Sequence, residues 1–285
     1  MQIVRTISDL RDAVRQARAG RQSVALVPTM GALHDGHLSL MRAARKENGF
    51  VVASVFVNPT QFAPDEDFGR YPRRIEEDAR LASAAGVSLL FAPEAAEMYP
   101  GGPGATFVVQ EELARKLCGR SRPTHFRGVL TVVAKLFHLV APDRAYFGQK
   151  DAQQALLIRR MVDDLNFPLE VRVCPIVREE DGLARSSRNE NLAPADRRAA
   201  PCLYRALAKA GAAYDAGERR SARIIEECSA VIRDEPLAKL DYFSIVDLRD
   251  LEEIETIDRG ALAAVAACFG NTRLIDNVLL GVAAL

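Results

Sequence analysis

Hydrophobic residues in the first part of the chain form short runs that alternate with segments of helical spacing. The runs predict strands at residues 23–27, 50–57, 87–92, 144–147 and 169–174, and the segments between them predict helices at 37–46, 73–85, 128–140 and 151–165. The second run, FVVASVFV, is almost entirely apolar and rich in Val, which is typical of a strand covered on both faces. Strands and helices in repeated alternation predict an α/β fold built on a parallel sheet.

The pattern changes near residue 175, where the polar, turn-rich segment PIVREEDGLARSSRNENLAPADRR begins. Later segments predict helices at 195–216 and 221–234 and strands at 240–246, 261–269 and 272–279, with FGNT as a hairpin turn. We therefore expect a Rossmann-like domain at residues 1–175, with helices on both faces of its sheet. A smaller C-terminal α+β domain is expected at residues 176–285.

Composition narrows the classes of function. Lys plus Arg and Asp plus Glu each number 38 among 285 residues, so the formal net charge is zero, which disfavours extended nucleic-acid binding. The five scattered cysteines include no CxxC and favour reduced thiols over disulfides or structural zinc. The N-terminus lacks the apolar core of a signal peptide, and no apolar run reaches membrane-spanning length. We expect a cytoplasmic protein without a membrane partner.

The first candidate site is VPTMGALHDGH, where a predicted strand ends in a loop with two glycines. His34 and His37 are three residues apart. If a helix begins near Asp35, both lie at its N-terminus, where backbone N–H groups and the helix dipole favour phosphate. The imidazoles would add N–H donors toward developing negative charge. A zinc site, which would need a third ligand, and a capped turn without a function are the alternatives.

Three more loops carry polar residues at similar places. VNPTQF ends the second predicted strand with amides that can bind a polar ligand, and YFGQKDAQQ places Lys150 and Asp151 at a helix start. Lys suits nucleotide phosphate, and Asp suits Mg²⁺ or a ribose. GLARSSRNENL offers two serines between Arg185 and Arg188, a combination suited to a triphosphate. Taken singly, these loops are also compatible with a turn, a solvated helix start and a linker.

Together the motifs resemble a known family. VPTMGALHDGH resembles the HxGH signature of the nucleotidyltransferases related to class I aminoacyl-tRNA synthetases, and GLARSSRN resembles their second signature. With FVNPTQF, RPTHFRGVLTVVAKLF and YFGQKDAQQ, essentially the whole chain resembles the pantoate–β-alanine ligase family. The resemblance implies a ligase of the coenzyme A pathway. Pantoate and ATP give pantoyl adenylate and pyrophosphate, and β-alanine then displaces AMP to form the amide of pantothenate.

The resemblance also implies roles for particular residues. His34, His37 and Lys150 would be catalytic, with His37 as the proton donor. The ATP-binding set would be Met30, Gly31, Ala32, Leu33, His34, Asp35, Gly36, His37, Gly148, Gln149, Lys150, Asp151, Val177, Arg185, Ser186, Ser187 and Arg188. Gln61 and Gln154 would bind pantoate, and Gln61 would also bind β-alanine. Mg²⁺ would bind mainly through the ATP phosphates, with Asp78 as its protein contact. The resemblance further implies a homodimer. The polar, turn-rich make-up of residues 175–191 and its Ser-Ser-Arg block predict a hinge, with the C-terminal domain closing on ATP as a lid.

The proposed chemistry agrees with the absence of a nucleophilic triad. The carboxylate of pantoate is ionised at pH 7 and can attack phosphorus without a general base. Two other functions remain open at this level: a different HxGH nucleotidyltransferase that acts on a small metabolite, and a nucleotide-binding module without catalysis. A tRNA-binding synthetase fragment fits poorly with zero net charge.

Overall fold

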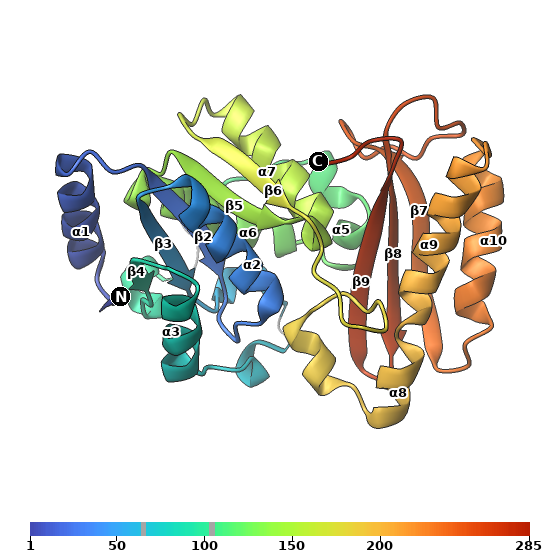
Figure 1. Cartoon of the computed structure of the whole chain (residues 1–285), viewed down its shortest axis with the longest axis horizontal. Coiled ribbons are helices and arrows are strands. Elements are labelled where there is room, and N and C mark those ends of the chain that lie inside the picture. The colour runs from blue at the N-terminus through green and yellow to red at the C-terminus, as the bar shows by residue number, and fades with distance from the viewer. Residues whose placement is uncertain (64–66, 103–105) are drawn as a thin grey trace. The chain divides into compact units, whose positions relative to one another are not determined.

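The computed structural model describes residues 1–63, 67–102 and 106–285 (Figure 1). Its contacts divide the chain into two compact units. Unit 1 comprises Met1–Arg115, Gly119–Gly148 and Leu157–Cys174, and unit 2 comprises Lys116–Cys118, Gln149–Leu156 and Pro175–Leu285. None of the helices in these described ranges has both the length and the apolar character needed to cross a membrane.

Unit 1 contains a six-stranded parallel sheet in the order β1-β4-β3-β2-β5-β6. Its strands are β1 (Gln2–Val4), β2 (Val24–Thr29), β3 (Phe50–Val55), β4 (Leu89–Phe91), β5 (Arg144–Gly148) and β6 (Glu170–Cys174). The helices in this part of the chain are α1 (Ile7–Ala19), α2 (Asp35–Glu47), α3 (Ile75–Ala84), α4 (Ala95–Met98), α5 (Cys118–Ser121), α6 (His125–Val140) and α7 (Ala152–Asp164). Short 3₁₀ helices are η1 (Pro59–Gln61), η2 (Asp67–Arg70), η3 (Leu113–Arg115) and η4 (Gln149–Asp151).

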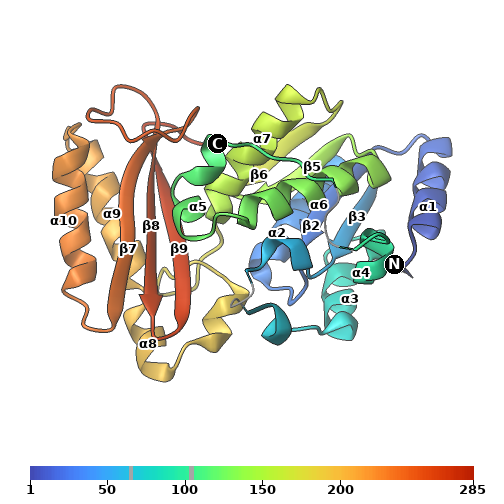
Figure 2. The same ribbon diagram turned by 180° about the vertical axis from the view of Figure 1, so that it is seen from behind.

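The sheet of unit 1 is covered on both faces, which confirms the predicted Rossmann-like α/β architecture. Figures 1 and 2 show α2 and α3 on one face and α6 on the other. Helix α2 packs on the sheet through Leu38, Met41 and Ala44, which recur at helical spacing and are buried. Strand β2 lies between β3 and β5, so the strand order reverses beside it. In parallel sheets, loops that leave such a strand's carboxyl end form ligand sites.

Unit 2 contains a three-stranded antiparallel sheet in the order β7-β8-β9, which confirms the predicted α+β architecture of this part of the chain. The strands are β7 (Ala238–Asp247), β8 (Ala261–Phe269) and β9 (Thr272–Leu280), and the helices are η5 (Ser187–Asn191), α8 (Pro194–Ala199), α9 (Cys202–Asp215) and α10 (Ser221–Arg233). Helices α9 and α10 contribute Leu203, Ala206 and Ile224 to a core shared with the alternate residues Ala263 and Val265 of β8. The alternation along β8 matches the two-residue period of a strand.

Two local predictions in unit 2 have different outcomes. Phe269 pairs with Thr272, so Gly270 and Asn271 form a two-residue hairpin turn, as FGNT predicts. Gly270 has φ +54°, a value that glycine adopts without strain. The single helix predicted at 195–216 is wrong, because the chain forms α8 and α9 on either side of Pro201. Proline lacks the N–H that a continuous helix would require there.

Candidate active site

The loop after β2 is held by the carboxylate of Asp78. Asp78 lies on α3 and is 1% exposed, and its two oxygens accept the backbone N–H groups of Ala32 (3.1 Å) and Leu33 (2.8 Å). Burial raises the pKa of this carboxyl, although the two hydrogen bonds oppose the shift. Gly31 has φ +87°, and a Cβ there would lie 2.9 Å from both Asp78 Oδ2 and Val55 Cγ1. The close approach of the loop to Asp78 therefore requires glycine at position 31.

The two histidines of this loop form the N-terminus of α2, which begins at Asp35 as expected. His34 is the N-cap, and its Nδ1 accepts the N–H of Gly36 at 3.2 Å. The Nδ1 of His37 accepts the N–H of His34 at 3.4 Å, and the ring centroids are 4.0 Å apart. A neutral imidazole carries its proton on the nitrogen that does not accept, so both rings are Nε2–H donors. The local fold thus sets two donors of the same kind side by side.

Gln61 is oriented by Asn58 at the end of the segment that follows β3. Asn58 is 1% exposed; its Nδ2 donates to Gln61 Oε1 (3.0 Å), and its Oδ1 accepts from the Tyr99 hydroxyl (2.8 Å). Because Asn58 occupies the oxygen of Gln61, the amide Nε2 is directed the other way, and it donates to Met30 Sδ at 3.0 Å. The structure therefore brings Gln61 next to the loop that carries the histidines.

Helix α6 supports this segment from its first turn. A Cβ on Gly128 would lie only 2.3 Å from the backbone oxygen of Thr60, so the helix approaches η1 more closely than any other residue type would allow. Nδ1 of His125, the first residue of α6, lies 3.0 Å from the backbone oxygen of Gln61. A carbonyl only accepts, so Nδ1 of His125 is the donor. His125 belongs to the family-like block RPTHFRG, but the sequence did not indicate this contact.

The segment with Lys150 divides between the two units. Gly148 ends β5 in unit 1, whereas Gln149, Lys150 and Asp151 form η4 in unit 2. The ammonium of Lys150 lies 3.6 Å from the Asp151 carboxylate. Within unit 2, Asn277 of β9 donates to the backbone oxygens of Gln149 (2.9 Å) and Lys150 (3.1 Å). The half-buried Gln154 follows on the first turn of α7.

The Arg-rich segment of unit 2 forms a short hairpin. Arg185 N–H donates to the backbone oxygen of Val177 at 2.9 Å, and residues 178 and 184 pair as an antiparallel bridge. Ser186 caps η5 by accepting the N–H of Arg188 at 3.3 Å. Glu179 accepts from Arg197 (2.7 Å) and Asn189 (2.9 Å). Burial raises the pKa of Glu179, but these hydrogen bonds outweigh it and hold the pKa below the ordinary value.

The predicted residues are thus grouped within the two units. In unit 1 the structure brings together Met30–His37, Gln61 and Asp78. Unit 2 contains Gln149–Asp151, Gln154, Val177 and Arg185–Arg188. The described residues include no cluster of three or more His, Cys, Asp or Glu side chains that could hold a metal ion. Both oxygens of Asp78 accept hydrogen bonds from the loop backbone.

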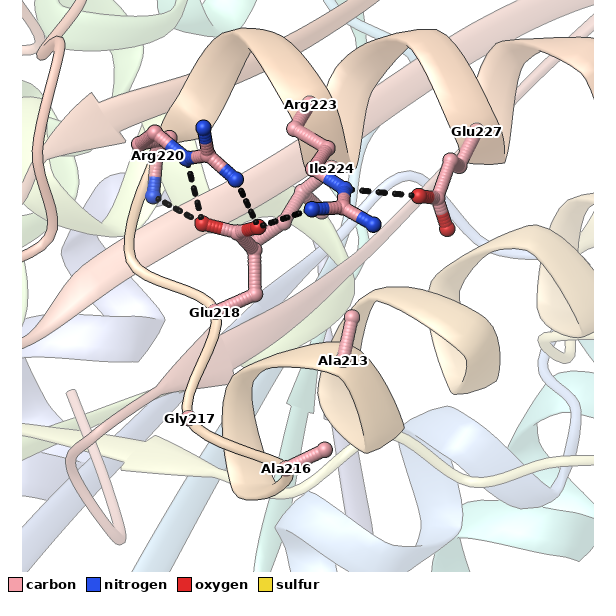
Figure 3. A pocket seen from close by; sticks show the side chains of 8 residues that line it. All are labelled: Ala213, Ala216, Gly217, Glu218, Arg220, Arg223, Ile224 and Glu227. Carbon is pink, nitrogen blue, oxygen red and sulfur yellow. Dashed lines mark hydrogen bonds and ion pairs between the residues drawn. The ribbon is translucent and has the colours of Figure 1, made fainter.

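A separate hollow of about 500 Å³ lies in unit 2 between α9 and α10 (Figure 3). It is lined by Ala213, Ala216, Gly217, Glu218, Arg220, Arg223, Ile224 and Glu227. Its charges pair with each other: Glu218 accepts from Arg220 at 2.9 Å and lies 3.4 Å from Arg223. Hydrogen bonds from Arg220 lower the pKa of Glu218 to about 2. None of the predicted site residues lines this hollow, and we do not assign it a function.

Comparison with known proteins identifies the family. The profile of the pantoate–β-alanine ligase family matches residues 2–279. The pantothenate synthetase of Acidobacterium capsulatum is 54% identical over 99% of this chain and 97% of its own length. That of Pelotomaculum thermopropionicum is 55% identical over 99% of both chains.

Solved structures agree with this assignment. The crystal structure of pantothenate synthetase from Thermus thermophilus has a TM-score of 0.92 and 50% identity, covering 98% of this chain and 99% of that one. The pantoate–β-alanine ligase from Francisella tularensis, complexed with β,γ-ATP and β-alanine, has a TM-score of 0.81 and 33% identity, covering 99% of both chains. The chain therefore belongs to the pantoate–β-alanine ligase family, and it is a ligase that joins pantoate to β-alanine.

Proposed function

We propose that this chain performs its family's reaction in two half-reactions, with ATP phosphates bound at the N-terminus of α2. The observation that carries the proposal is the shared orientation of His34 and His37, whose Nδ1 atoms accept backbone N–H groups. This orientation makes both Nε2 atoms donors, as stabilisation of phosphate charge requires. ATP and β-alanine as ligands are also supported by the relative from Francisella tularensis.

In the first half-reaction, a carboxylate oxygen of pantoate attacks the α-phosphorus of ATP. A bond forms between that oxygen and phosphorus, and the bond from phosphorus to the bridging oxygen of pyrophosphate breaks. Gln61 and Gln154 would hold pantoate. The Nε2–H groups of His34 and His37 and the ammonium of Lys150 would donate hydrogen bonds to the phosphates and stabilise the charge that develops there; the Nε2 proton of His37 would be shared with a phosphate oxygen in this way. The backbone of Met30–His37 and of Gly148–Asp151 would bind ATP, together with Val177 and Arg185–Arg188.

In the second half-reaction, the amine of β-alanine attacks the acyl carbon of pantoyl adenylate. The carbon–nitrogen bond forms, the bond from carbon to the phosphate oxygen of AMP breaks, and the amine loses a proton. Gln61 would contact β-alanine as well as pantoate. Its Oε1 accepts from Asn58, so its Nε2, which points toward Met30, would be the group that contacts the substrates. Mg²⁺, bound through the ATP phosphates with at most Asp78 from the protein, would neutralise phosphate charge.

A pyrophosphate-exchange assay tests the first half-reaction. With pantoate, ATP and Mg²⁺ but no β-alanine, the enzyme should exchange labelled pyrophosphate into ATP, because adenylate formation needs no amine. Lys150→Ala should depress exchange by about 10²-fold or more, whereas Lys239→Ala, at an exposed position on β7, should not. The same Lys150→Ala protein should use preformed pantoyl adenylate with a smaller loss. Exchange that strictly requires β-alanine would mean a concerted reaction, and ATP binding without any turnover would mean a non-catalytic module.

Four further properties are part of the proposal. Chelation of Mg²⁺ should abolish adenylate formation, and added Mg²⁺ should restore it.

Residues 176–285 would act as a lid, so ATP with Mg²⁺ should slow proteolysis of the segment 175–191. Equal cleavage with and without ATP would contradict a lid. A homodimer should appear by light scattering after gel filtration. A cytoplasmic location would be checked by cell fractionation.

A further inference from the structure

Asn277 of β9 uses its whole side-chain amide to hold the segment with Lys150. Its Nδ2 donates to the backbone oxygens of both Gln149 (2.9 Å) and Lys150 (3.1 Å), and its Oδ1 accepts from Gln149 Nε2 at 3.2 Å. The residue is 4% exposed. Only an amide carries two donors and an acceptor in this arrangement, since a carboxylate has no donor and a hydroxyl has one. These bonds fix consecutive peptide groups of η4, the element in which Lys150 lies.

Asp276, the residue before Asn277 on β9, holds the hairpin of unit 2 that leads into Arg185–Arg188. Both carboxylate oxygens of the buried Asp276 accept from Arg178, at 2.6 and 3.0 Å. Arg178 also donates to the backbone oxygen of Gly182 (3.0 Å), and its guanidinium stacks 4.6 Å from the Tyr204 ring centroid. Arg178 belongs to the hairpin that leads into Arg185–Arg188. Two successive residues of one strand thus anchor two segments that are distant in sequence.

Asp276 also lies within electrostatic range of the Lys150 ammonium. Burial raises the pKa of Asp276, while the hydrogen bonds and charge of Arg178 and the charge of Lys150 lower it. The Lys150 side chain therefore leaves a segment whose backbone is held by Asn277, and its charge acts on the carboxylate that Arg178 holds.

We propose that Asn277 is a positioning residue for adenylate formation: it holds the backbone at Gln149 and Lys150 so that the Lys150 ammonium meets the phosphates in the productive place. The inference rests on the proposed function of Lys150. It assigns no contact between Asn277 and substrate. A displacement of about 1 Å of a catalytic group can cost about 10²-fold in rate, so loss of the two anchoring bonds should be visible in the first half-reaction.

A double-mutant cycle between Asn277→Asp and Lys150→Ala tests the inference. Asn277→Asp keeps the size of the side chain but removes both donors. We expect pyrophosphate exchange to fall about 10- to 100-fold, while the reaction of preformed pantoyl adenylate with β-alanine stays within about threefold. In the Lys150→Ala background, Asn277→Asp should cause little further loss, because Asn277 acts through Lys150. Asn271→Asp, at the exposed hairpin turn between β8 and β9, is the matched control and should behave as wild type.

Several outcomes would overturn the inference. Losses that multiply fully in the double variant would show that Asn277 acts independently of Lys150. Equal losses in the two half-reactions would show a general structural role, and Asn277→Ala, which adds no charge, repeats the comparison if the Asp variant does not fold. If Lys150→Ala itself leaves exchange unchanged, the proposed function of Lys150 fails, and the inference fails with it. A different result would overturn the inference but leave the proposed function of Lys150 intact: normal exchange by Asn277→Asp together with strongly reduced exchange by Lys150→Ala.

Discussion

At the scale of single residues, the chemistry of each histidine depends on which ring nitrogen makes its hydrogen bond to the backbone. His34 and His37 use Nδ1 to accept backbone N–H groups, and His125 uses Nδ1 to donate to a carbonyl. The first two rings therefore carry donors on Nε2, whereas a neutral His125 has an acceptor there. Sequence motifs identify histidine but not this orientation, because the hydrogen-bond partners of each ring depend on the folded backbone.

The variants His37→Asn and His37→Gln distinguish the role of Nδ1 from that of Nε2. The Asn oxygen can accept the His34 N–H in place of Nδ1, but it leaves no donor at the Nε2 position, which the longer Gln amide can supply. We expect His37→Asn to lower the rate of adenylate formation by about 10²–10³-fold and His37→Gln to retain clearly more activity. Single-turnover kinetics beside a thermal melt would measure both effects, with His138→Asn, at an exposed position of α6, as control. Equal losses for Asn and Gln would contradict a donor role for Nε2.

The orientation of Gln61 leads to a second prediction at this scale. In Gln61→Glu, one oxygen can still accept from Asn58, but a carboxylate oxygen replaces the Nε2 donor. A substrate carboxylate would then meet like charge, so KM for pantoate should rise by about tenfold or more, as expected for about 1–3 kcal/mol from a lost buried hydrogen bond. Steady-state kinetics in pantoate and in ATP would show the effect. Gln16→Glu, at an exposed position of α1, is the control. A raised KM for ATP with an unchanged KM for pantoate would contradict the assignment.

At the scale of elements, the fold could be predicted where the signal is local. The run at residues 50–57 and the spacing of Leu38, Met41 and Ala44 are local patterns, and they correspond to β3 and α2. The anchor of the histidine loop is not local, because Asp78 lies 45 residues from Leu33 and its first-turn position on α3 looks like that of a solvated acid. Strand β1, with three residues, is too short for its pairing with β4 to appear as a periodic pattern.

The contact between β5 and the end of α2 should govern part of the alkaline stability. Tyr146 donates to Glu47 (2.9 Å) and accepts from Asn48 (2.8 Å), and burial together with Glu47 raises its pKa to about 12. Because the folded pKa lies above the ordinary value of 10, the stabilisation from Tyr146 is complete below pH 10 and is lost as the pH rises through 12.

Tyr146→Phe should therefore cost about 1 kcal/mol in the free energy of unfolding at pH 8. The difference from wild type should shrink between pH 10 and pH 12, since the phenol of the unfolded chain ionises from pH 10 whereas that of the folded chain stays protonated up to about pH 12. Urea unfolding at a series of pH values would measure the difference, with Tyr204→Phe, at a partly exposed position, as control. A difference that stays constant across this range would contradict the account.

At the scale of the whole molecule, the described residues of each unit form a hydrophobic core. One includes Val27, Met41 and Leu90 of the parallel sheet and its helices, and the other includes Leu203 and Val265 of the antiparallel unit. The change of hydrophobic pattern near residue 175 is visible in the sequence. The membership of residues 149–156 in unit 2 is not, because it depends on contacts such as that of Lys150 with Asn277, which are 127 residues apart.

Weakening one core should loosen its own unit first. Leu203→Ala should cost about 2–5 kcal/mol, because Leu203 is buried in unit 2, and it should speed hydrogen exchange of the amides of β7, β8 and β9. The amides of β2 and β3 should keep most of their protection. Leu237→Ala, at an exposed position, should change neither sheet. Equal acceleration in both sheets would mean that the chain unfolds as one cooperative unit.

The hydrogen bond from Asn277 to the backbone oxygen of Gln149 also has a consequence for the timing of protein synthesis. The two partners are 128 residues apart, so a ribosome that adds about 5–20 residues per second makes Asn277 on the order of ten seconds after Gln149. During that interval the nascent Lys150 segment lacks its strand partner. We therefore expect a ribosome-bound chain to acquire the capacity to activate pantoate only after β9 has emerged, however early the parallel sheet folds.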